Sequence, residues 1–134
     1  MIRKATIKDI AKIKKLVDSS PEMDADMLTF PKMYFKRIIQ KEIMLVAEEK
    51  KKIIGICFGS YNTKEKWADL LGLVVSKKFR KKGTGKELLE QFELVAKKRK
   101  AKTIDFYTNS AYSALLNKLK YKKGRTFTSF RKKL

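Results

Sequence analysis

The sequence predicts an α/β (α+β) fold, a mixed central sheet of about six to seven strands with about four helices, in a single domain spanning residues 1–134. Three observations lead to this class. The hydrophobic content of 43% suffices for one core, and a chain of 134 residues is too short for two domains. The spacing of apolar residues changes along the chain between the two-residue period of strands and the 3.6-residue period of helices. A basic, glycine-containing turn joins a strand to a helix within 67–98.

The chain is predicted to begin with a strand and a helix. A short strand over 2–5 leads into a helix from about residue 7. Thr6 has the side chain expected of an N-cap, and Asp9 falls in the first turn, where a carboxylate is favoured. The segment SSPEMDADMLTFP follows as a turn-rich, locally acidic loop.

A second helix and a hairpin complete the N-terminal half. The helix is predicted over 32–40 by its apolar spacing. The runs IMLVAEE at 43–49 and IIGICFGSY at 53–61 are rich in β-branched and apolar residues and are separated by the tight turn KKK. They predict an antiparallel hairpin.

The C-terminal half alternates strands and helices. WADLLGLVVS at 67–76 predicts a third consecutive strand. From Gly85 onward, apolar residues recur at the spacing of an amphipathic helix with a lysine-rich outer face. TIDFYT at 103–108 then predicts a strand, SAYSALLNKL at 110–119 a helix, and RTFTSFRK at 125–132 a final strand.

Composition excludes several kinds of chemistry. The chain has no histidine, which removes Ser-His-Asp and Cys-His catalysis and every His-containing metal site, and no metal is predicted. The single cysteine, Cys57, lies inside an apolar run and is expected to be buried in a reducing environment. No apolar run reaches membrane-spanning length and the N-terminus resembles no signal peptide, so a cytoplasmic protein without membrane contact is expected.

The sequence SKKFRKKGTGKELLEQF at 76–92 carries the most informative motif. A nucleoside-triphosphate P-loop does not fit, because Arg80 stands where its first glycine belongs and Glu87 follows Lys86 in place of a hydroxyl. The dinucleotide fingerprint also fails, since only Gly83 and Gly85 of its glycines are present. What remains is Arg80-x-x-Gly83-x-Gly85 between a strand and the helix that it opens.

This arrangement suits a pyrophosphate. The first backbone N–H groups of a helix have no intrahelical acceptor and lie at the positive end of its dipole. Glycines remove the Cβ atoms that would obstruct an approaching phosphate, and six cations surround the turn. These cations are Lys77, Lys78, Arg80, Lys81, Lys82 and Lys86.

On these residues the chain resembles the GNAT superfamily of acetyl-CoA-dependent N-acetyltransferases, whose signature is R/Q-x-x-G-x-G/A after a strand. The resemblance implies a GNAT-like fold, an N-acetyltransferase and acetyl-CoA as co-substrate. It implies that strand backbone groups pair with pantetheine and that the turn holds the pyrophosphate. The cofactor-binding residues that it implies are Leu73, Val74, Val75, Arg80, Lys81, Lys82, Gly83, Thr84, Gly85, Lys86 and Asn109. An ordinary strand-end or capping role for Asn109 stays open.

The resemblance also suggests catalytic residues. Asp69 occupies a place on the strand where some members carry a general base, and we expect it to share a face with Leu71 and Leu73; a solvent-facing role is the alternative. The family's usual acid, a Tyr in Tyr-x-x-x-Gly-Phe, is absent, because Leu116 and Lys120 replace its Tyr and Gly. Tyr112, one turn earlier, could supply the hydroxyl or belong to the core.

The acceptor is expected to be an amine. The first helix-to-helix loop contains Asp18, Glu22, Asp24 and Asp26 on a chain whose formal charge is +20. An acidic loop on an otherwise basic protein would attract a cationic acceptor, such as a polyamine-like small molecule, a lysine or a protein N-terminus. A solvated loop is the alternative.

The charge also supports a different class of function. Basic clusters at 97–102, 118–125 and 131–133, interleaved with aromatic residues, would suit a phosphate-tracking surface. The alternative is therefore a nucleic-acid- or ribosome-associated module whose acetyl-CoA site is vestigial or regulatory. Generic solvated charge accounts for the same clusters.

Overall fold

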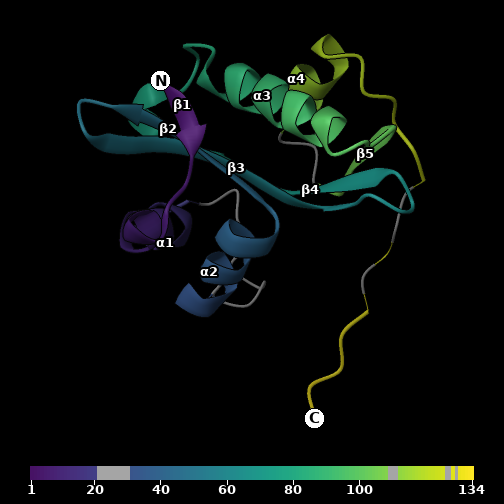
Figure 1. The fold of residues 1–134 in the computed structure, drawn as a ribbon, viewed down its shortest axis with the longest axis horizontal. Coiled ribbons are helices and arrows are strands. Elements are labelled where there is room, and N and C mark those ends of the chain that lie inside the picture. The colour runs from purple at the N-terminus through teal and green to yellow at the C-terminus, as the bar shows by residue number, and fades with distance from the viewer. Residues whose placement is uncertain (21–30, 109–111, 126–127, 129) are drawn as a thin grey trace.

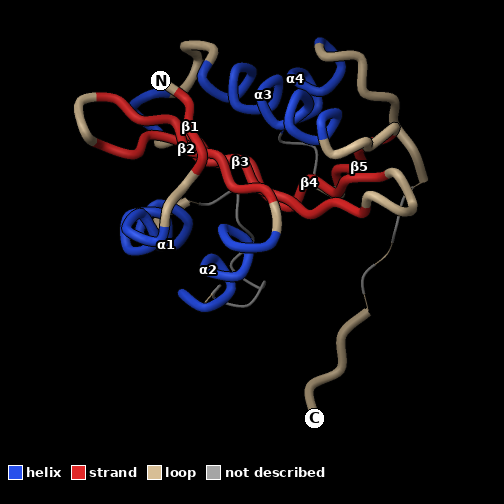
Figure 2. Tube along the Cα trace, viewed as in Figure 1, coloured by secondary structure: helices blue, strands red, loops and turns tan. Residues whose placement is uncertain are grey.

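A five-stranded sheet with helices on both faces forms the body of the molecule (Figure 1). The computed structural model describes residues 1–20, 31–108, 112–125, 128 and 130–134. Figure 2 shows which segments of the chain are helices, strands and loops. The elements are β1 (Ile2–Lys4), η1 (Ile7–Asp9), α1 (Ile10–Asp18), α2 (Lys32–Lys41), β2 (Ile43–Glu49), β3 (Lys52–Asn62), β4 (Trp67–Val75), η2 (Lys77–Phe79), α3 (Thr84–Lys98), β5 (Thr103–Phe106) and α4 (Ser113–Lys118).

The strands lie in chain order, β1-β2-β3-β4-β5. The first four pair antiparallel, which confirms the predicted hairpins, and β5 pairs parallel to β4. A parallel neighbour requires a crossover, and α3 supplies it. The mixed α/β fold that the sequence predicts is therefore confirmed.

Apolar side chains form two cores, one on each face of the sheet. Helices α3 and α4 cover one face, where Leu88 and Phe92 are fully buried. Helices α1 and α2 cover the other, where Ile13 and Phe35 are fully buried. Each such side chain stabilises the fold by about 1.5–3 kcal/mol. Cys57 is fully buried against the first core, as predicted, and burial raises the pKa of its thiol well above the usual value.

The N-terminal turn is fixed by a buried carboxylate. Asp9 accepts hydrogen bonds from the Arg3 guanidinium at 2.8 and 3.0 Å and from the Thr6 backbone N–H at 2.7 Å. Arg3 also pairs with Glu48 of β2 at 2.8 Å. Thr6 is the N-cap of the first helical turn, as the sequence predicts, and the network ties that turn to β2.

Strand β4 contains a β-bulge. Its pairing with β3 skips Leu71, whose side chain is 42% exposed. Because the extra residue inverts the alternation of faces, Leu70 and Leu73 both pack in the α3 core. The expectation that Asp69 and Leu73 share a face is therefore wrong.

The C-terminal segment differs from its prediction. Its described residues within 125–132 form no strand, so the described sheet has five strands instead of six or seven. The local alternation of this segment fits a strand, but a strand also needs a neighbour to pair with. The described parts lead away from the sheet (Figure 1), and Phe130 is 92% exposed.

Candidate functional site

The edge of β4 facing β5 is open over half of its length. Strand β5 pairs with β4 only from Trp67 to Leu70, whereas β4 continues to Val75. Among the described residues, no strand pairs with this side of β4 beyond Leu70. The last part of β4 therefore carries backbone groups that no β-ladder satisfies.

The register identifies which backbone groups these are. The Ser76 N–H donates to the Ile54 carbonyl at 2.7 Å, and Val74 pairs with β3 in the same ladder. In an antiparallel pair, successive residues point their N–H and C=O alternately toward and away from the partner strand. Leu73 and Val75 therefore direct their backbone groups to the open edge. Val74 directs its own toward β3.

Two side chains donate hydrogen bonds at this open edge. The Tyr112 hydroxyl, from the start of α4, donates to the Leu73 carbonyl. The Arg80 Nε–H donates to the Val75 carbonyl at 3.0 Å. Tyr112 also packs its ring against Phe106 of β5, with centroids 5.8 Å apart. The edge is thus bounded by a phenol on one side and a guanidinium on the other.

The glycine turn lies next to this edge and opens α3. Gly83 is the N-cap of α3 and has φ +85°, a conformation that favours glycine. Gly85 has no such requirement, and a Cβ placed there would lie 3.7 Å from Val75 and Leu115, an ordinary contact distance. The fold therefore leaves room for a side chain at Gly85, on the side that faces the open edge.

The turn concentrates positive charge at the start of α3. The Glu87 N–H is bonded to the Gly83 carbonyl, so the N–H groups that precede it in α3 have no intrahelical acceptor. Arg80 is half-buried, and five lysines around it are exposed. Lys82 lies over the Phe79 ring, 5.4 Å from its centroid. This geometry and charge favour an anion at the helix start.

Asp69 lies on the other face of β4 from the α3 core, half-buried and at the same register as Asp105 of β5. Burial, and secondarily the charge of Asp105, raises the pKa of Asp69 above its usual value. A carboxyl with a raised pKa is a better proton acceptor than an ordinary aspartate.

The two catalytic candidates are separated along the strand. Asp69 precedes Leu73 by four residues, which corresponds to about 10–13 Å along a bulged strand. Since the Tyr112 hydroxyl contacts Leu73, the carboxyl and the phenol lie on either side of the bulge at Leu71.

Some predicted residues lie outside the described part of the chain. These are Asn109 and the acidic loop residues Glu22, Asp24 and Asp26. Asp18 is described and forms an ion pair with Lys14 at 2.8 Å. Lys120 has φ +66°, so it adopts the backbone conformation of the glycine that it replaces in the family pattern.

Sequence reasoning missed two features of this region. The place of Asp105 beside Asp69 does not follow from the sequence, because it depends on the register of a parallel pair of strands far apart in the chain. The Tyr121 hydroxyl is buried without a hydrogen-bond partner among the described residues. Burial, followed by the charge of Glu93, raises the pKa of Tyr121.

The described residues contain no cluster of three or more His, Cys, Asp or Glu side chains suited to a metal ion. None of the helices in the described ranges has the length and apolar character needed to cross a membrane.

Comparison with known proteins gives one family. The acetyltransferase (GNAT) family model matches residues 7–118. No curated protein sequence matches the chain.

Solved structures give the same fold. Aminoglycoside acetyltransferase AAC(6')-Iy, solved with the bisubstrate analogue CoA-S-monomethyl-acetylneamine, has a TM-score of 0.82 at 16% identity, covering 100% of this chain and 98% of that chain. Glucosamine-6-phosphate N-acetyltransferase from Arabidopsis thaliana has a TM-score of 0.78 at 18% identity, covering 98% and 97%. An acetyltransferase of Trypanosoma brucei has a TM-score of 0.79 at 12% identity, covering 98% of both chains.

Proposed function

Because this chain belongs to the GNAT family of acetyltransferases, we propose that it transfers an acetyl group from acetyl-CoA directly to the nitrogen of an amine. One observation carries the proposal. The open edge of β4, with the backbone groups of Leu73 and Val75 directed into it, adjoins a helix start whose N–H groups and surrounding cations favour an anion. An amide-containing chain with a pyrophosphate at one end matches both features together.

The residues present fit this co-substrate. The Leu73 and Val75 N–H groups would donate to the carbonyls of the pantetheine amides, and the backbone from Lys81 to Lys86 would hold the pyrophosphate. Arg80, whose Nε–H donates to the Val75 carbonyl, would place its charge between the pantetheine and the pyrophosphate. The absence of a side chain at Gly85, where the fold has room for one, supports a ligand that approaches the helix start closely.

Asp69 is proposed as the general base, acting directly or through a water. Bound acetyl-CoA supplies an activated thioester carbonyl. A lysine-like amine with a pKa of about 10.4 costs on the order of 4–5 kcal/mol to deprotonate at pH 7, whereas an α-amine costs about 1 kcal/mol. The carboxyl of Asp69, whose pKa burial raises, would accept that proton. The Tyr112 hydroxyl, which donates to the Leu73 carbonyl in the free protein, would turn from that carbonyl to donate a hydrogen bond or proton to the leaving thiolate.

The acceptor is proposed to be a cationic amine. Asp69 and Asp105 lie at one register on a chain of formal charge +20, so this face of β4 and β5 is locally acidic. Solved structures with this fold include enzymes named for an aminoglycoside and for glucosamine 6-phosphate, which supports a small amine-bearing acceptor. A polyamine-like molecule, a lysine or a protein N-terminus would meet the same requirement.

Calorimetric titration with acetyl-CoA near physiological ionic strength tests this function, because salt screens nonspecific attraction to a basic surface. We expect saturable one-site binding that is absent for ATP. A variant carrying Arg80→Ala and Gly83→Asp should lose it, because it removes the anchored cation and places a carboxylate at the helix start.

The matched control is Arg125→Ala, which removes the same cationic side chain from an exposed position in the C-terminal segment. It should bind acetyl-CoA as the wild type does. Equal weak binding of acetyl-CoA, ATP and duplex nucleic acid, with a steep dependence on salt, would reject the proposal. That outcome would favour the nucleic-acid-binding alternative.

A further inference from the structure

Two segments that are far apart in the chain bring lysines together at the C-terminal end of α3. The Lys102 N–H donates to the Lys66 carbonyl at 2.8 Å, which ties the segment after α3 to the turn between β3 and β4. Figure 1 shows this turn and the end of α3 on the same side of the molecule. The result is a group of exposed lysines, which we call the lysine surface: Lys64, Lys66, Lys97, Lys98, Lys100 and Lys102.

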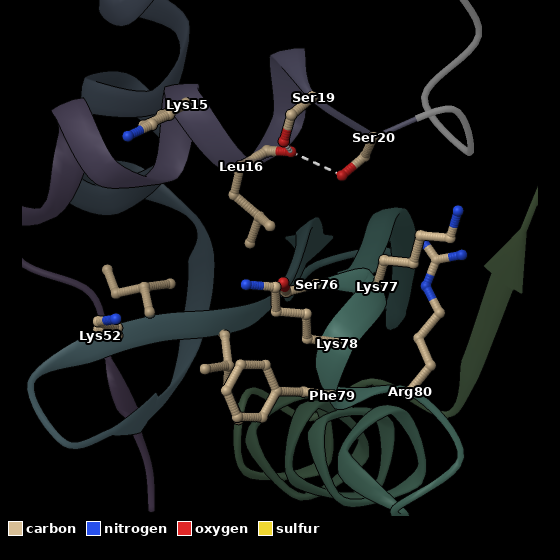
Figure 3. A pocket seen from close by; sticks show the side chains of 12 residues that line it. Lys15, Leu16, Ser19, Ser20, Lys52, Ser76, Lys77, Lys78, Phe79 and Arg80 are labelled. Atoms are coloured by element: carbon tan, nitrogen blue, oxygen red, sulfur yellow. Dashed lines mark hydrogen bonds between the residues drawn. The ribbon is translucent and has the colours of Figure 1, made fainter.

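The lysine surface is separate from the cations beside the proposed acetyl-CoA site. Those cations include Lys52, Lys77 and Lys78, which line a pocket next to the glycine turn (Figure 3). Lys52 begins β3, whereas Lys64 and Lys66 follow its other end, so the 11 residues of this strand place the two regions about 30 Å apart. The proposed function uses no lysine of this surface.

Neighbouring carboxylates do not neutralise the lysine surface. None of its side chains forms an ion pair or a hydrogen bond with a described residue. Glu65 is the one acidic residue within 62–66 and 97–102, where it stands against seven cations. Asp69 and its neighbour Asp105 lie on the face of the sheet opposite to α3. The two segments therefore carry a strong positive potential, which favours a polyanion.

The acidic residues outside the described ranges belong to a different part of the chain. They are Glu22, Asp24 and Asp26. Their segment joins α1 to α2, and these two helices cover the face of the sheet opposite to α3. Both ends of that segment therefore lie across the sheet from the lysine surface.

Helix capping accounts for only part of the charge. Lys97 and Lys98 lie in the last turn of α3, where cations interact favourably with the negative end of the helix dipole. That interaction falls off within one turn, so it gives no reason for cations at Lys64, Lys66 and Lys102. The fold thus leaves these lysines available to a partner.

The surface lacks features that two other anionic partners require. The bases of a single-stranded nucleic acid stack on exposed aromatic rings. Here the Arg99 guanidinium covers the Tyr61 ring, 5.0 Å from its centroid, and Trp67 is half-buried. A membrane-binding surface combines cations with apolar side chains that enter the lipid, and 62–66 and 97–102 contain no exposed apolar side chain.

We propose that the lysine surface binds the phosphate backbone of a nucleic-acid duplex. Each strand of a duplex carries one negative charge per about 3.4 Å, so a duplex offers many phosphates to lysines spread over two segments. Lysine contacts to phosphate hold a protein on a duplex without reading its sequence. This inference goes beyond acetyl transfer and does not rest on it.

The backbone at two of these lysines allows a test that separates charge from folding. Lys66 and Lys100 have φ of +62° and +69°, a conformation that glycine adopts more readily than lysine. The surface variant, Lys66→Gly with Lys100→Gly, therefore removes two charges at positions where glycine suits the fold.

The matched control is Lys50→Gly with Lys51→Gly. These lysines have φ of +50° and +64°, are exposed and lie in the turn between β2 and β3, at the other end of β3. The two variants have the same net charge, so only the position of the lost charges differs. Urea unfolding of the same preparations checks that each variant is folded.

Fluorescence anisotropy of a labelled DNA duplex measures Kd over a range of salt concentrations around physiological ionic strength. We expect the surface variant to raise Kd about tenfold or more and to lower the slope of log Kd against log salt by about 2, because each lost phosphate contact lowers it by about 1. The control should stay within about twofold of the wild type.

Equal losses in the two variants would mean that binding follows net charge alone and would overturn the inference. A surface variant that binds like the wild type, or a wild type that does not bind the duplex near physiological ionic strength, would overturn it too. Equal or tighter binding of the single strand, poly-glutamate or phosphatidylserine vesicles would do the same, because each indicates another partner. Acetyl-CoA is absent from these measurements, so a failure of the proposed function does not affect them.

Discussion

The hydroxyl of Tyr112 donates a hydrogen bond to the backbone carbonyl of Leu73, 39 residues away in the chain, on the side of β4 that β5 leaves open. The ring packs against Phe106 while the oxygen reaches the strand edge. The Tyr112 side chain therefore packs its ring in the core and donates a hydrogen bond at the strand edge at the same time. The start of α4 thus places a phenol hydroxyl at the open edge of β4.

Replacing Tyr112 with Phe should lower kcat by about 10- to 100-fold, because the change removes one proton donor and keeps the ring that packs in the core. The KM for acetyl-CoA should stay within about twofold, since the backbone groups of Leu73 remain. Steady-state kinetics with a reactive amine acceptor measure both constants. Tyr61→Phe in β3, which removes a hydroxyl that accepts a hydrogen bond from Arg99, is the control and should leave both unchanged. A kcat equal to that of wild type would remove Tyr112 from the mechanism.

Replacing Asp105 with Asn should lower the pKa of Asp69. The pKa of Asp69 is raised first by burial and then by the charge of Asp105, and the variant removes only the second cause. The pKa should therefore move toward its usual value without reaching it. Carboxyl ¹³C NMR of the aspartates follows the titration directly, and Asp69→Asn identifies the resonance by its loss. A pKa for Asp69 that is unchanged in the Asp105 variant would show that the two carboxyls do not interact.

Local patterns were sufficient for the features that depend on neighbours in sequence. The hairpins, the glycine turn at the start of α3, the burial of Cys57 and the capping role of Thr6 all follow from periodicity or short-range hydrogen bonding. The bulge at Leu71 could not be predicted in this way. The sequence WADLLGLVV is apolar on both sides of it, so no change of period marks the extra residue.

Features that depend on distant pairing escaped prediction for a related reason. The segment 125–132 has the local pattern of a strand, but strand formation depends on a partner that periodicity does not reveal. Asp105 stands beside Asp69 only because of the β4–β5 register. Arg80 was predicted as a charge near phosphates, whereas its hydrogen bond to the Val75 carbonyl became visible only in three dimensions.

The Asp9 carboxyl should make the stability of the protein sensitive to acid. The Arg3 guanidinium, followed by the Thr6 backbone N–H, lowers the pKa of Asp9 to about 2, although burial acts in the opposite direction. A carboxyl with a depressed pKa stabilises the folded state above the unfolded pKa of about 3.9, and this stabilisation is lost as the pH falls toward 2.

Asp9→Asn should therefore lower the free energy of unfolding at pH 7 by about 1–3 kcal/mol, with the difference from wild type shrinking between about pH 4 and 2. Urea unfolding across this range measures it. Asp18→Asn, whose carboxylate makes only an exposed ion pair with Lys14, should change stability by less than about 0.5 kcal/mol. A pH-independent difference for Asp9→Asn would reject the electrostatic account.

Glycine should stabilise the protein at two positions where a lysine follows the end of a helix. Lys100 and Lys120 have φ of +69° and +66°, and each follows the last turn of its helix. The next residue in each case donates its N–H back to the helix, from Ala101 to Ala96 at 3.0 Å and from Tyr121 to Leu116 at 2.9 Å. This is the Schellman arrangement, in which glycine is preferred because it lacks a Cβ.

Lys100→Gly and Lys120→Gly should each raise the free energy of unfolding by up to about 1 kcal/mol, measured by urea titration. The control is Gln91→Gly, at an exposed position inside α3, which should lower it by about 1 kcal/mol because the helix interior disfavours glycine. If all three changes destabilise the protein, the left-handed backbone at Lys100 and Lys120 is not the source of strain proposed.

The two glycines of the turn should respond to alanine in opposite ways. Gly83 has φ +85°, so Gly83→Ala should lower the free energy of unfolding by about 1–2 kcal/mol even though its Cβ would have no neighbour within 4 Å. Gly85 lies in the first turn of α3, where its Cβ would make only ordinary contacts with Val75 and Leu115. Gly85→Ala should therefore leave stability unchanged or raise it by up to about 1 kcal/mol.

Affinity for acetyl-CoA shows whether glycine at position 85 is needed for ligand binding, because stability alone does not require it. If the pyrophosphate approaches the start of α3 closely, the methyl group of Gly85→Ala obstructs it, and the Kd for acetyl-CoA should rise about tenfold or more in a protein that is no less stable. Calorimetry and urea unfolding of the same preparation measure the two quantities. Normal affinity in the Gly85→Ala variant would mean that the ligand does not contact this part of the turn. A loss of affinity without a loss of stability, in contrast, can arise only from the bound state, because the free protein accommodates the methyl group.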